Sequence, residues 1–159
     1  MAWGMDTFTS SVVNLLDKNN TTTSSADISG GLVNRVKVVR RGKYSIAPIP
    51  NTQYPCVFVR VRSKDSDTFE HLGNCNHKRD QYANVEIVPI VQLGTNLNSE
   101  AEMYKLTSNI EALIRAHISL SSTVNDCLIV GVDYDSESVS DEFHNVFSII
   151  NIRAHKLSD

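Results

Sequence analysis

The sequence predicts an α+β fold in a single domain covering residues 1–159: an antiparallel sheet with a long β-hairpin and two main helices packed on one face. Its 159 residues fit one domain, since domains commonly run to about 100–200 residues. Two segments repeat apolar residues with a helical period, and several others alternate as half-buried strands do. The predicted order is helix, strand, hairpin, helix, hairpin. Because this order lacks βαβ repeats, it favours α+β over α/β.

The first helix is predicted in TFTSSVVNLLDK, where Phe8, Val12, Leu15 and Leu16 lie on one face and Asp6 precedes them as an N-cap. It ends in NNTTTSSADISGG, which is rich in Ser, Thr, Asn and Gly. We expect residues 18–31 to form a flexible loop.

A short strand is predicted in RVKVVRR, followed by GKYSIAPIPNTQYP, whose three prolines favour an extended crossing along the surface. CVFVRVRS then alternates as a half-buried strand does. The alternation places Val57, Val59 and Val61 on one face and Phe58, Arg60 and Arg62 on the other.

The return strand of the long hairpin is predicted in YANVEIVPIVQLG. Its two faces carry Val85, Ile87 and Val91 on one side and Glu86, Val88 and Ile90 on the other. Pro89 has no N–H to donate, so it predicts a sheet edge or a bulge at that point. Residues 63–81 would form the hairpin connection.

The second helix is predicted in NSEAEMYKLTSNIEALIRAHI, opened by a capping box of Ser99 and Glu102. Its apolar stripe continues to His117, which we expect to be a core or interface histidine rather than a ligand. Two further strands, CLIVGVDY and NVFSIINIRAH, form a second hairpin around the acidic turn DSESVSDE. The stripe itself comprises Met103, Leu106, Ile110, Leu113, Ile114, His117 and Ile118.

The net charge, the cysteines and the apolar runs of the sequence argue against several classes of protein. The net charge of −3 argues against a general nucleic-acid binder. Cys56 and Cys127 sit in apolar runs and Cys75 is alone, so no disulfide framework is indicated and a reducing compartment is favoured. The start MAWGMDTF lacks a signal-peptide pattern, and no apolar run approaches the about 18 residues of a membrane helix. We expect a protein made in a cytoplasm, with no membrane partner.

One stretch, EHLGNCNHKRD, raises the question of chemistry, because His71, Cys75, His77 and Asp80 lie close together. Structural zinc sites usually present two ligand pairs, and no second pair follows here. A Cys75–His77 nucleophile would lack a third orienting residue and would sit at a hairpin tip. The favoured interpretation is therefore a polar hairpin end, with a metal-dependent hydrolase centred on His71, Cys75 and His77 as the enzyme alternative.

The remaining motif search predicts no enzyme and no cofactor. No P-loop, dinucleotide-binding, nucleophile-elbow or HExxH motif occurs. DYDSESVSDE lacks the glycine and the terminal Glu spacing of a calcium loop, so we interpret it as a solvated turn. Its acidic residues are Asp133, Asp135, Glu137, Asp141 and Glu142.

The charged residues suggest a second use, as contacts between identical subunits. Basic residues group apart from the acidic turn, and such separation favours head-to-tail association. Two alternatives stay open: solvated strand edges, or a weakly attractive lining near DNA. The basic group comprises Arg40, Arg41, Lys43, Arg60, Arg62, Lys64, Lys78 and Arg79.

With these segments in order, the chain resembles the tail terminator, or tail-completion, proteins of long-tailed bacteriophages, the lambda-like group of neck proteins. The resemblance rests on the N-terminal helix and polar loop, the strand entry YPCVFVRVR, and the return strand KRDQYANVEIVPIV. The capped helix SEAEMYKLTSNIEALIRAHI and the closing pair CLIVGVDYD and FHNVFSIINIRAHKL complete it. It covers nearly the whole chain as a pattern of elements. The loop at 18–31 and the Cys/His-containing connection depart from it.

The resemblance implies a structural virion protein at the head–tail junction, assembled in the host cytoplasm, that forms a ring expected to be hexameric. Such a ring would cap the tail tube, end its polymerisation and present a surface to the head-completion or neck protein. DNA would pass through the lumen without sequence-specific binding. Other neck components and a tail-tube subunit are the alternatives. The expected interface residues are Phe69, His71, Lys78, Arg79, Arg40, Arg41, Asp133 and Asp135.

Overall fold

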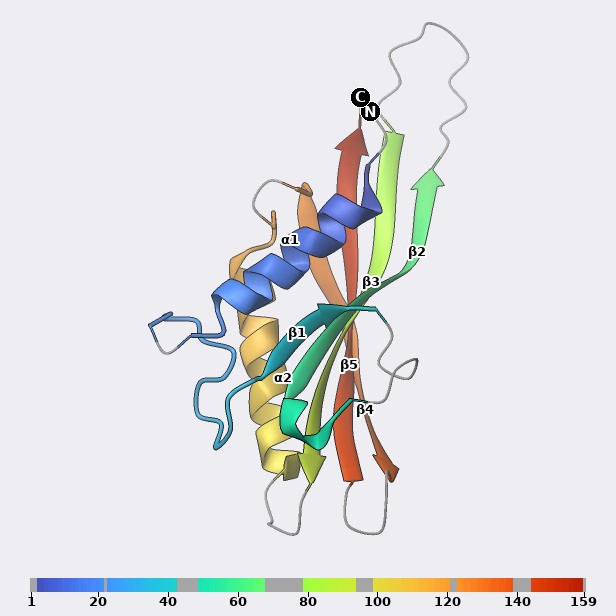
Figure 1. The fold of residues 1–159 in the computed structure, drawn as a ribbon. Helices are drawn as coiled ribbons and strands as arrows, with labels where there is room; N and C mark the ends of the chain where they lie inside the picture. Colours follow the sequence, from blue (N-terminus) through green and yellow to red (C-terminus); the bar gives the residue numbers. More distant parts are fainter. Residues whose placement is uncertain are drawn as a thin grey trace, which may run out of the picture.

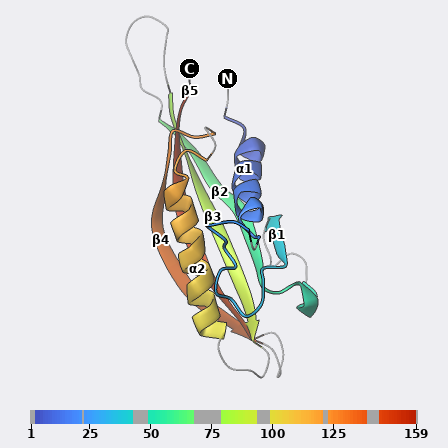
Figure 2. The ribbon, with the colours of Figure 1, turned by 90° about the vertical axis from the view of Figure 1, so that its left-hand side faces the viewer.

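The computed structural model describes residues 3–21, 23–42, 49–67, 79–93, 99–120, 123–138 and 144–158. Within them the chain forms one α+β domain, a mixed five-stranded sheet with two α-helices, as predicted (Figures 1 and 2). The strand order is β1-β2-β3-β5-β4. The elements are α1 (Met5–Lys18), β1 (Val38–Arg41), the 3-10 helix η2 (Asn51–Gln53), β2 (Cys56–Asp67), β3 (Arg79–Leu93), α2 (Ser99–Ala116), β4 (Asp126–Ser138) and β5 (His144–Ser158).

Both predicted hairpins are present, but the sheet is not wholly antiparallel. β2 pairs with β3, β3 with β5 and β5 with β4, all antiparallel, whereas β1 is parallel to β2. Val38 lies opposite Cys56, so the chain leaves the far end of β1 and returns to the starting end before it enters β2. That return, rather than a tight turn, makes β1 parallel.

The two faces of the sheet differ in what covers them. The helix face packs against α1 and α2, whose buried side chains join those of the sheet in one large core. The opposite face, called the open face below, carries a smaller cluster of Cys56, Phe58, Val88, Ile90 and Phe147, against which Ile49 and Tyr54 pack. The helix-face core includes Phe8, Val12, Leu16, Val57, Val59, Val85, Ile87, Met103, Leu106, Ile110, Leu113, Ile114, Ile150 and Ile152. The alternation predicted for both strands of the long hairpin is confirmed.

Pro89 corrects one prediction. It lies in β3, which is a central strand and not an edge, and it stands opposite Val57 of β2. The β3–β5 pairing is interrupted over Val88 and Pro89, then resumes in the same register. The missing N–H of proline is thus accommodated by a local gap in the ladder rather than by an edge or a bulge.

The structure also corrects two expectations at the helix ends, one of them only in part. Gly4, not Asp6, is the N-cap of α1, and Asp6 lies in the first turn, where a carboxylate still complements the helix dipole. α2 ends at Ala116, so His117 is exposed in the following turn and is not a core histidine; the alternative, an interface histidine, stays a prediction. Leu120, buried with a positive φ of 44°, continues the apolar packing instead.

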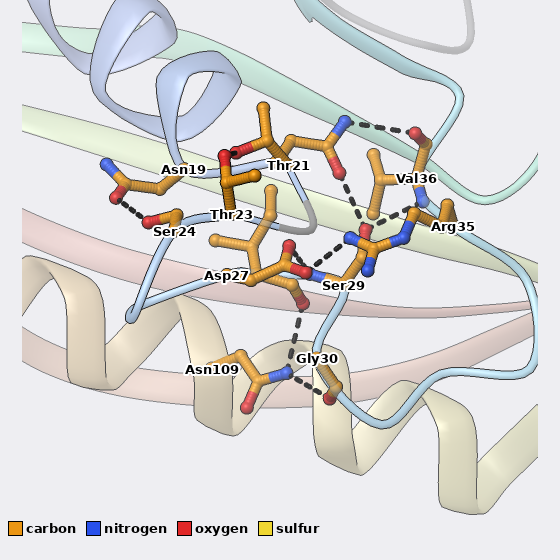
Figure 3. A network of polar contacts seen from close by, with 12 residues as sticks. Asn19, Thr21, Thr23, Ser24, Asp27, Ser29, Gly30, Arg35, Val36 and Asn109 are labelled. Atoms are coloured by element: carbon orange, nitrogen blue, oxygen red, sulfur yellow. Dashed lines mark hydrogen bonds and ion pairs between the residues drawn. The ribbon is translucent and has the colours of Figure 1, made fainter.

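The segment between α1 and β1, predicted as a flexible loop, is irregular but densely hydrogen-bonded (Figure 3). The Ser29 hydroxyl is buried, donates to Oδ1 of Asn20 at 2.6 Å and accepts from the N–H of Val36 at 2.9 Å. Asn20 in turn donates to the carbonyl of Val36 at 3.0 Å. These bonds tie the two ends of the segment together.

Three polar side chains on one face of α2 hold the same segment from the other side. They lie at i, i+3 and i+7, which places them along one line of the helix. Glu102 accepts from the N–H of Val33 at 2.9 Å, Lys105 donates to the carbonyl of Gly31 at 3.0 Å, and Asn109 donates to the carbonyls of Ile28 and Gly30 at 3.0 and 2.9 Å. The Glu102 carboxylate, predicted to help cap α2, therefore anchors the loop to α2.

Candidate functional site: the two edges of the sheet

The Cys/His-containing connection lies outside the described residues. β2 extends to Asp67 and β3 begins at Arg79, so the connection spans 68–78 rather than 63–81. Arg79 contributes only its backbone to the described part, and the side chain of Asp80 also lies outside it. The other predicted residues of this stretch, Phe69, His71, Cys75, His77 and Lys78, fall within the connection itself.

The described residues contain no group of three or more His, Cys, Asp or Glu side chains that could hold a metal ion. Burial raises the pKa of the Cys56 and Cys127 thiols to about 12, which leaves both protonated and poorly nucleophilic near neutral pH. No helix in the described part of the chain combines the length and apolar character needed to cross a membrane.

Both outer edges of the sheet present strand backbone. Among the described strands none pairs with the outer side of β4, which runs from Asp126 to Ser138. On the other side β1 pairs with only the first four residues of β2, so within the described part of the chain no strand pairs with the outer side of residues 60–67 (Figure 1). The outer sides of β4 and of β1–β2 are called the two open edges below. Unpaired strand edges are templates for association with another chain.

The two edges carry opposite charge. The sequence of β4 contains four acidic residues and no Lys or Arg, whereas β1 and β2 together contain five basic residues and two acidic ones. The acids of β4 are Asp126, Asp133, Asp135 and Glu137; the bases are Arg40, Arg41, Arg60, Arg62 and Lys64. The charge separation predicted from the sequence thus falls on opposite edges of one sheet.

At the basic edge, Arg60 and Arg62 share one carboxylate. Arg60 Nε and Arg62 Nη1 both bind Glu86, the latter at 3.2 Å, and the Glu86 side chain is only 4% exposed. Two guanidinium groups on one carboxylate leave a net positive charge on the open face. The cluster borders a shallow groove of about 320 Å³ whose lining includes Arg62, Glu86, Val130 and Asn151.

The other basic residues differ in their availability. Arg41 points to the helix face and forms an ion pair with Asp6 of α1. Lys64 donates to the backbone carbonyl of Trp3 at 2.8 Å. Arg40 is exposed on the open face, and the described residues provide it with no ion-pair partner. Three arginines were predicted at an interface. Arg41 is paired with Asp6 and the side chain of Arg79 lies outside the described residues, so Arg40 is the available one in the described part of the chain.

At the acidic edge, apolar and charged side chains are exposed together. Leu128 and Val130 are 65% and 63% exposed, whereas the neighbouring Cys127 is buried. Asp133 is exposed and accepts a hydrogen bond from Nδ2 of Asn151 at 3.2 Å. Asp135 is exposed as well. Leu128 and Val130 were not among the predicted interface residues. The signal in the sequence was the departure of CLIVGVDY from strict alternation, which reflects the β-bulge between Ile129 and Gly131.

On the helix face, β4 is attached to α2 by an aromatic contact. The rings of Tyr134 and Tyr104 meet edge to face with centroids 5.2 Å apart. The hydroxyl of Tyr104 donates to Oε1 of Glu100 at 2.8 Å, and this bond raises the pKa of Tyr104; burial raises the pKa of Tyr134. β4 is thus supported on one face and open at its edge.

No protein-family model matches this chain, and no curated protein sequence matches it either.

Proposed function

We propose that this chain is a structural virion subunit that associates head to tail with copies of itself into a ring, as tail terminator proteins do. The ring would cap the tube of a long-tailed phage, end its polymerisation and present a joining surface to the neck. Its partners would be further copies of the chain, the tail-tube protein and the head-completion protein, with DNA passing through the lumen. No catalytic step is part of this role.

The observation that supports the proposal is the opposite charge of the two open edges of one sheet. β4 is acidic and the β1–β2 edge is basic, so the β4 edge of one copy is complementary in charge to the β1–β2 edge of the next copy. Such a heterologous contact uses two different surfaces, and it generates a closed ring when the rotation between copies closes. A two-fold dimer would instead bring like edges together, which the like charges oppose.

Native mass spectrometry of the full chain, followed by electron microscopy with purified tail tubes that lack a terminator, tests the proposal. We expect one closed oligomer and rings bound at a single end of each tube. Decoration along the whole tube would indicate a tube subunit instead. A chain that stays monomeric at all concentrations and leaves tube length unlimited would overturn the proposal.

A further inference from the structure

We propose that the acidic β4 edge of one copy docks along the β1–β2 edge of the next copy, antiparallel to β1 and β2, with Asp133 opposite Arg40. This inference rests on the proposed self-association and names the contact that produces it. Strand direction, the level of the charges and the outline of the two edges support it separately.

Strand direction permits the contact. β2 is antiparallel to β3, β3 to β5 and β5 to β4, so β4 runs opposite to β2. β1 is parallel to β2 and therefore also runs opposite to β4. A second copy placed beside the first in the same orientation thus presents an antiparallel neighbour to β4, and the alternation of the sheet continues across the junction. Antiparallel pairing is the slightly more stable arrangement per residue.

The charges lie at the same level of the sheet. Arg40 pairs with Phe58, and Phe58 with Val88; Asp133 pairs with Ile149. The β3–β5 register is unchanged on both sides of the gap at Pro89, which places Val88 opposite Ile149. Arg40 and Asp133 are therefore the two ends of one row across the sheet. Residues paired across strands share a face, so both project on the open face.

The outline of one edge matches the other. Arg41, the last residue of β1, shares a row with Val132, and the next row, without β1, joins Arg60 to Gly131. The basic edge therefore steps inward by one strand spacing, about 4.8 Å, at the level of Gly131. The bulge of β4 begins at the same level, and its extra residue is Val130. A bulge bends its strand and re-aims a side chain.

Exposed apolar surface adds to the contact. Leu128 and Val130 lie beyond the step, at the level where β2 has no outer neighbour. In the proposed arrangement they cover that stretch of the next copy's β2. β4 contains no lysine or proline along its edge, which are common means of preventing strand edges from associating. A second copy is the occupant because the complementary charge, direction and outline all belong to this same chain.

Charge reversal tests the contact in the full-length chain. Arg40→Asp or Asp133→Arg alone places like charges opposite each other, and we expect either to raise the apparent dissociation constant of the oligomer at least tenfold in sedimentation velocity. The double variant, with Arg40→Asp and Asp133→Arg in one chain, restores an attractive pair and should assemble close to wild type. Matched controls are Asp17→Arg and Lys18→Asp, exposed charges at the end of α1 that should not alter assembly.

Each outcome has a separate meaning. If the wild-type chain is oligomeric and neither reversal changes its assembly, the proposed contact is contradicted but the ring proposal is not. A double variant that stays dissociated has the same meaning. A monomeric wild-type chain contradicts the proposed function itself. If circular dichroism shows that a reversal unfolds the chain, Arg40→Gln and Asp133→Asn take its place; each must weaken assembly, and unchanged assembly contradicts the contact.

Discussion

Two polar regions of this molecule differ in whether their side chains find partners within the chain. The segment between α1 and β1 was predicted to be a flexible loop. The acidic residues Asp133 and Asp135, which the structure places in β4, were predicted to belong to a solvated turn. In the structure the first uses its hydrogen-bonding groups within the chain, through Ser29, Asn20 and Asn109 (Figure 3). The second leaves Asp133, Asp135 and two large apolar side chains exposed at a sheet edge.

The difference shows that polar composition does not by itself decide whether a segment is mobile, structural or available for a partner. What decides is whether the donors and acceptors find partners inside the fold, because a buried polar group without a partner is costly. Variants in the loop should therefore change the stability of the isolated subunit, whereas variants at the β4 edge should change assembly and leave that stability nearly intact.

The largest expected effect on stability is that of Ser29→Ala. It removes a buried hydroxyl and leaves the Asn20 side chain and the Val36 N–H without their partner, which should lower the free energy of unfolding by about 1–3 kcal/mol. Urea denaturation of the subunit measures it. Ser25→Ala, an exposed serine in the same loop, is the control and should be nearly neutral. Equal values for both variants would mean that the network does not hold the loop.

Asn109→Ala should have a smaller effect, about 1 kcal/mol, because one of the two carbonyls it releases, that of Gly30, belongs to an exposed residue, whereas Ile28 is buried. The informative readout is amide hydrogen exchange over residues 28–36, which should accelerate while exchange in the sheet does not. Ser108→Ala, exposed on the same helix, should leave both unchanged. Fast exchange of this loop already in the wild-type chain would restore the original prediction of a flexible segment.

Alkylation of the cysteines tests whether the side of β4 that packs on the helix-face core is protected from solvent. Cys127 should resist alkylation at pH 8 in the native chain, and so should Cys56, as peptide mapping by mass spectrometry would detect. Because burial raises both pKa values above the unfolded value of 9.0, the stability that these thiols contribute is fully present below about pH 9 and is lost as the pH rises towards 12. Rapid labelling of Cys127 at pH 8 would show that β4 opens readily.

The smallest change in subunit stability is expected from Leu128→Ser. Since this side chain is 65% exposed, unfolding should shift by no more than about 0.5 kcal/mol, while assembly weakens. Ile118→Ser, 51% exposed in the turn after α2, removes similar apolar surface away from the edge and should alter neither property. A loss of stability comparable to that of Ser29→Ala would instead place Leu128 in the folding core.

The fold was largely predictable because its strong periodic patterns match its buried faces. Val57, Val59, Val85 and Ile87 alternate in sequence and lie on the helix face. The predicted stripe of the second helix is buried from Met103 to Ile114 but not at His117 and Ile118, which follow the end of α2. The pairing of strands that are distant in the sequence was harder to predict. Neither the parallel direction of β1 nor the central position of Pro89 has a local sequence signal, since each depends on which strands become neighbours.

The candidate site was predictable only in part. Opposite charge groups were visible in the sequence, and Arg40 and Asp133 were among the expected interface residues. Their position at the two ends of one row, and the coincidence of the β4 bulge with the end of β1, follow from registers between strands far apart in the chain. The sequence could not show that Arg41 is unavailable for an interface, because its ion pair with Asp6 depends on how α1 crosses β1.

The central claim is a head-to-tail contact between unlike edges, and mixing two variants tests it most directly. Each variant alone places like charges opposite each other at every junction, so each should be monomeric by native mass spectrometry. Arg40→Asp nevertheless keeps a wild-type β4 edge, and Asp133→Arg keeps a wild-type β1–β2 edge. Mixed in equal amounts, they should form closed rings in which the two variants alternate, because both junctions then join opposite charges. A mixture that remains monomeric, or two variants that assemble separately as well as the wild-type chain, would contradict the account.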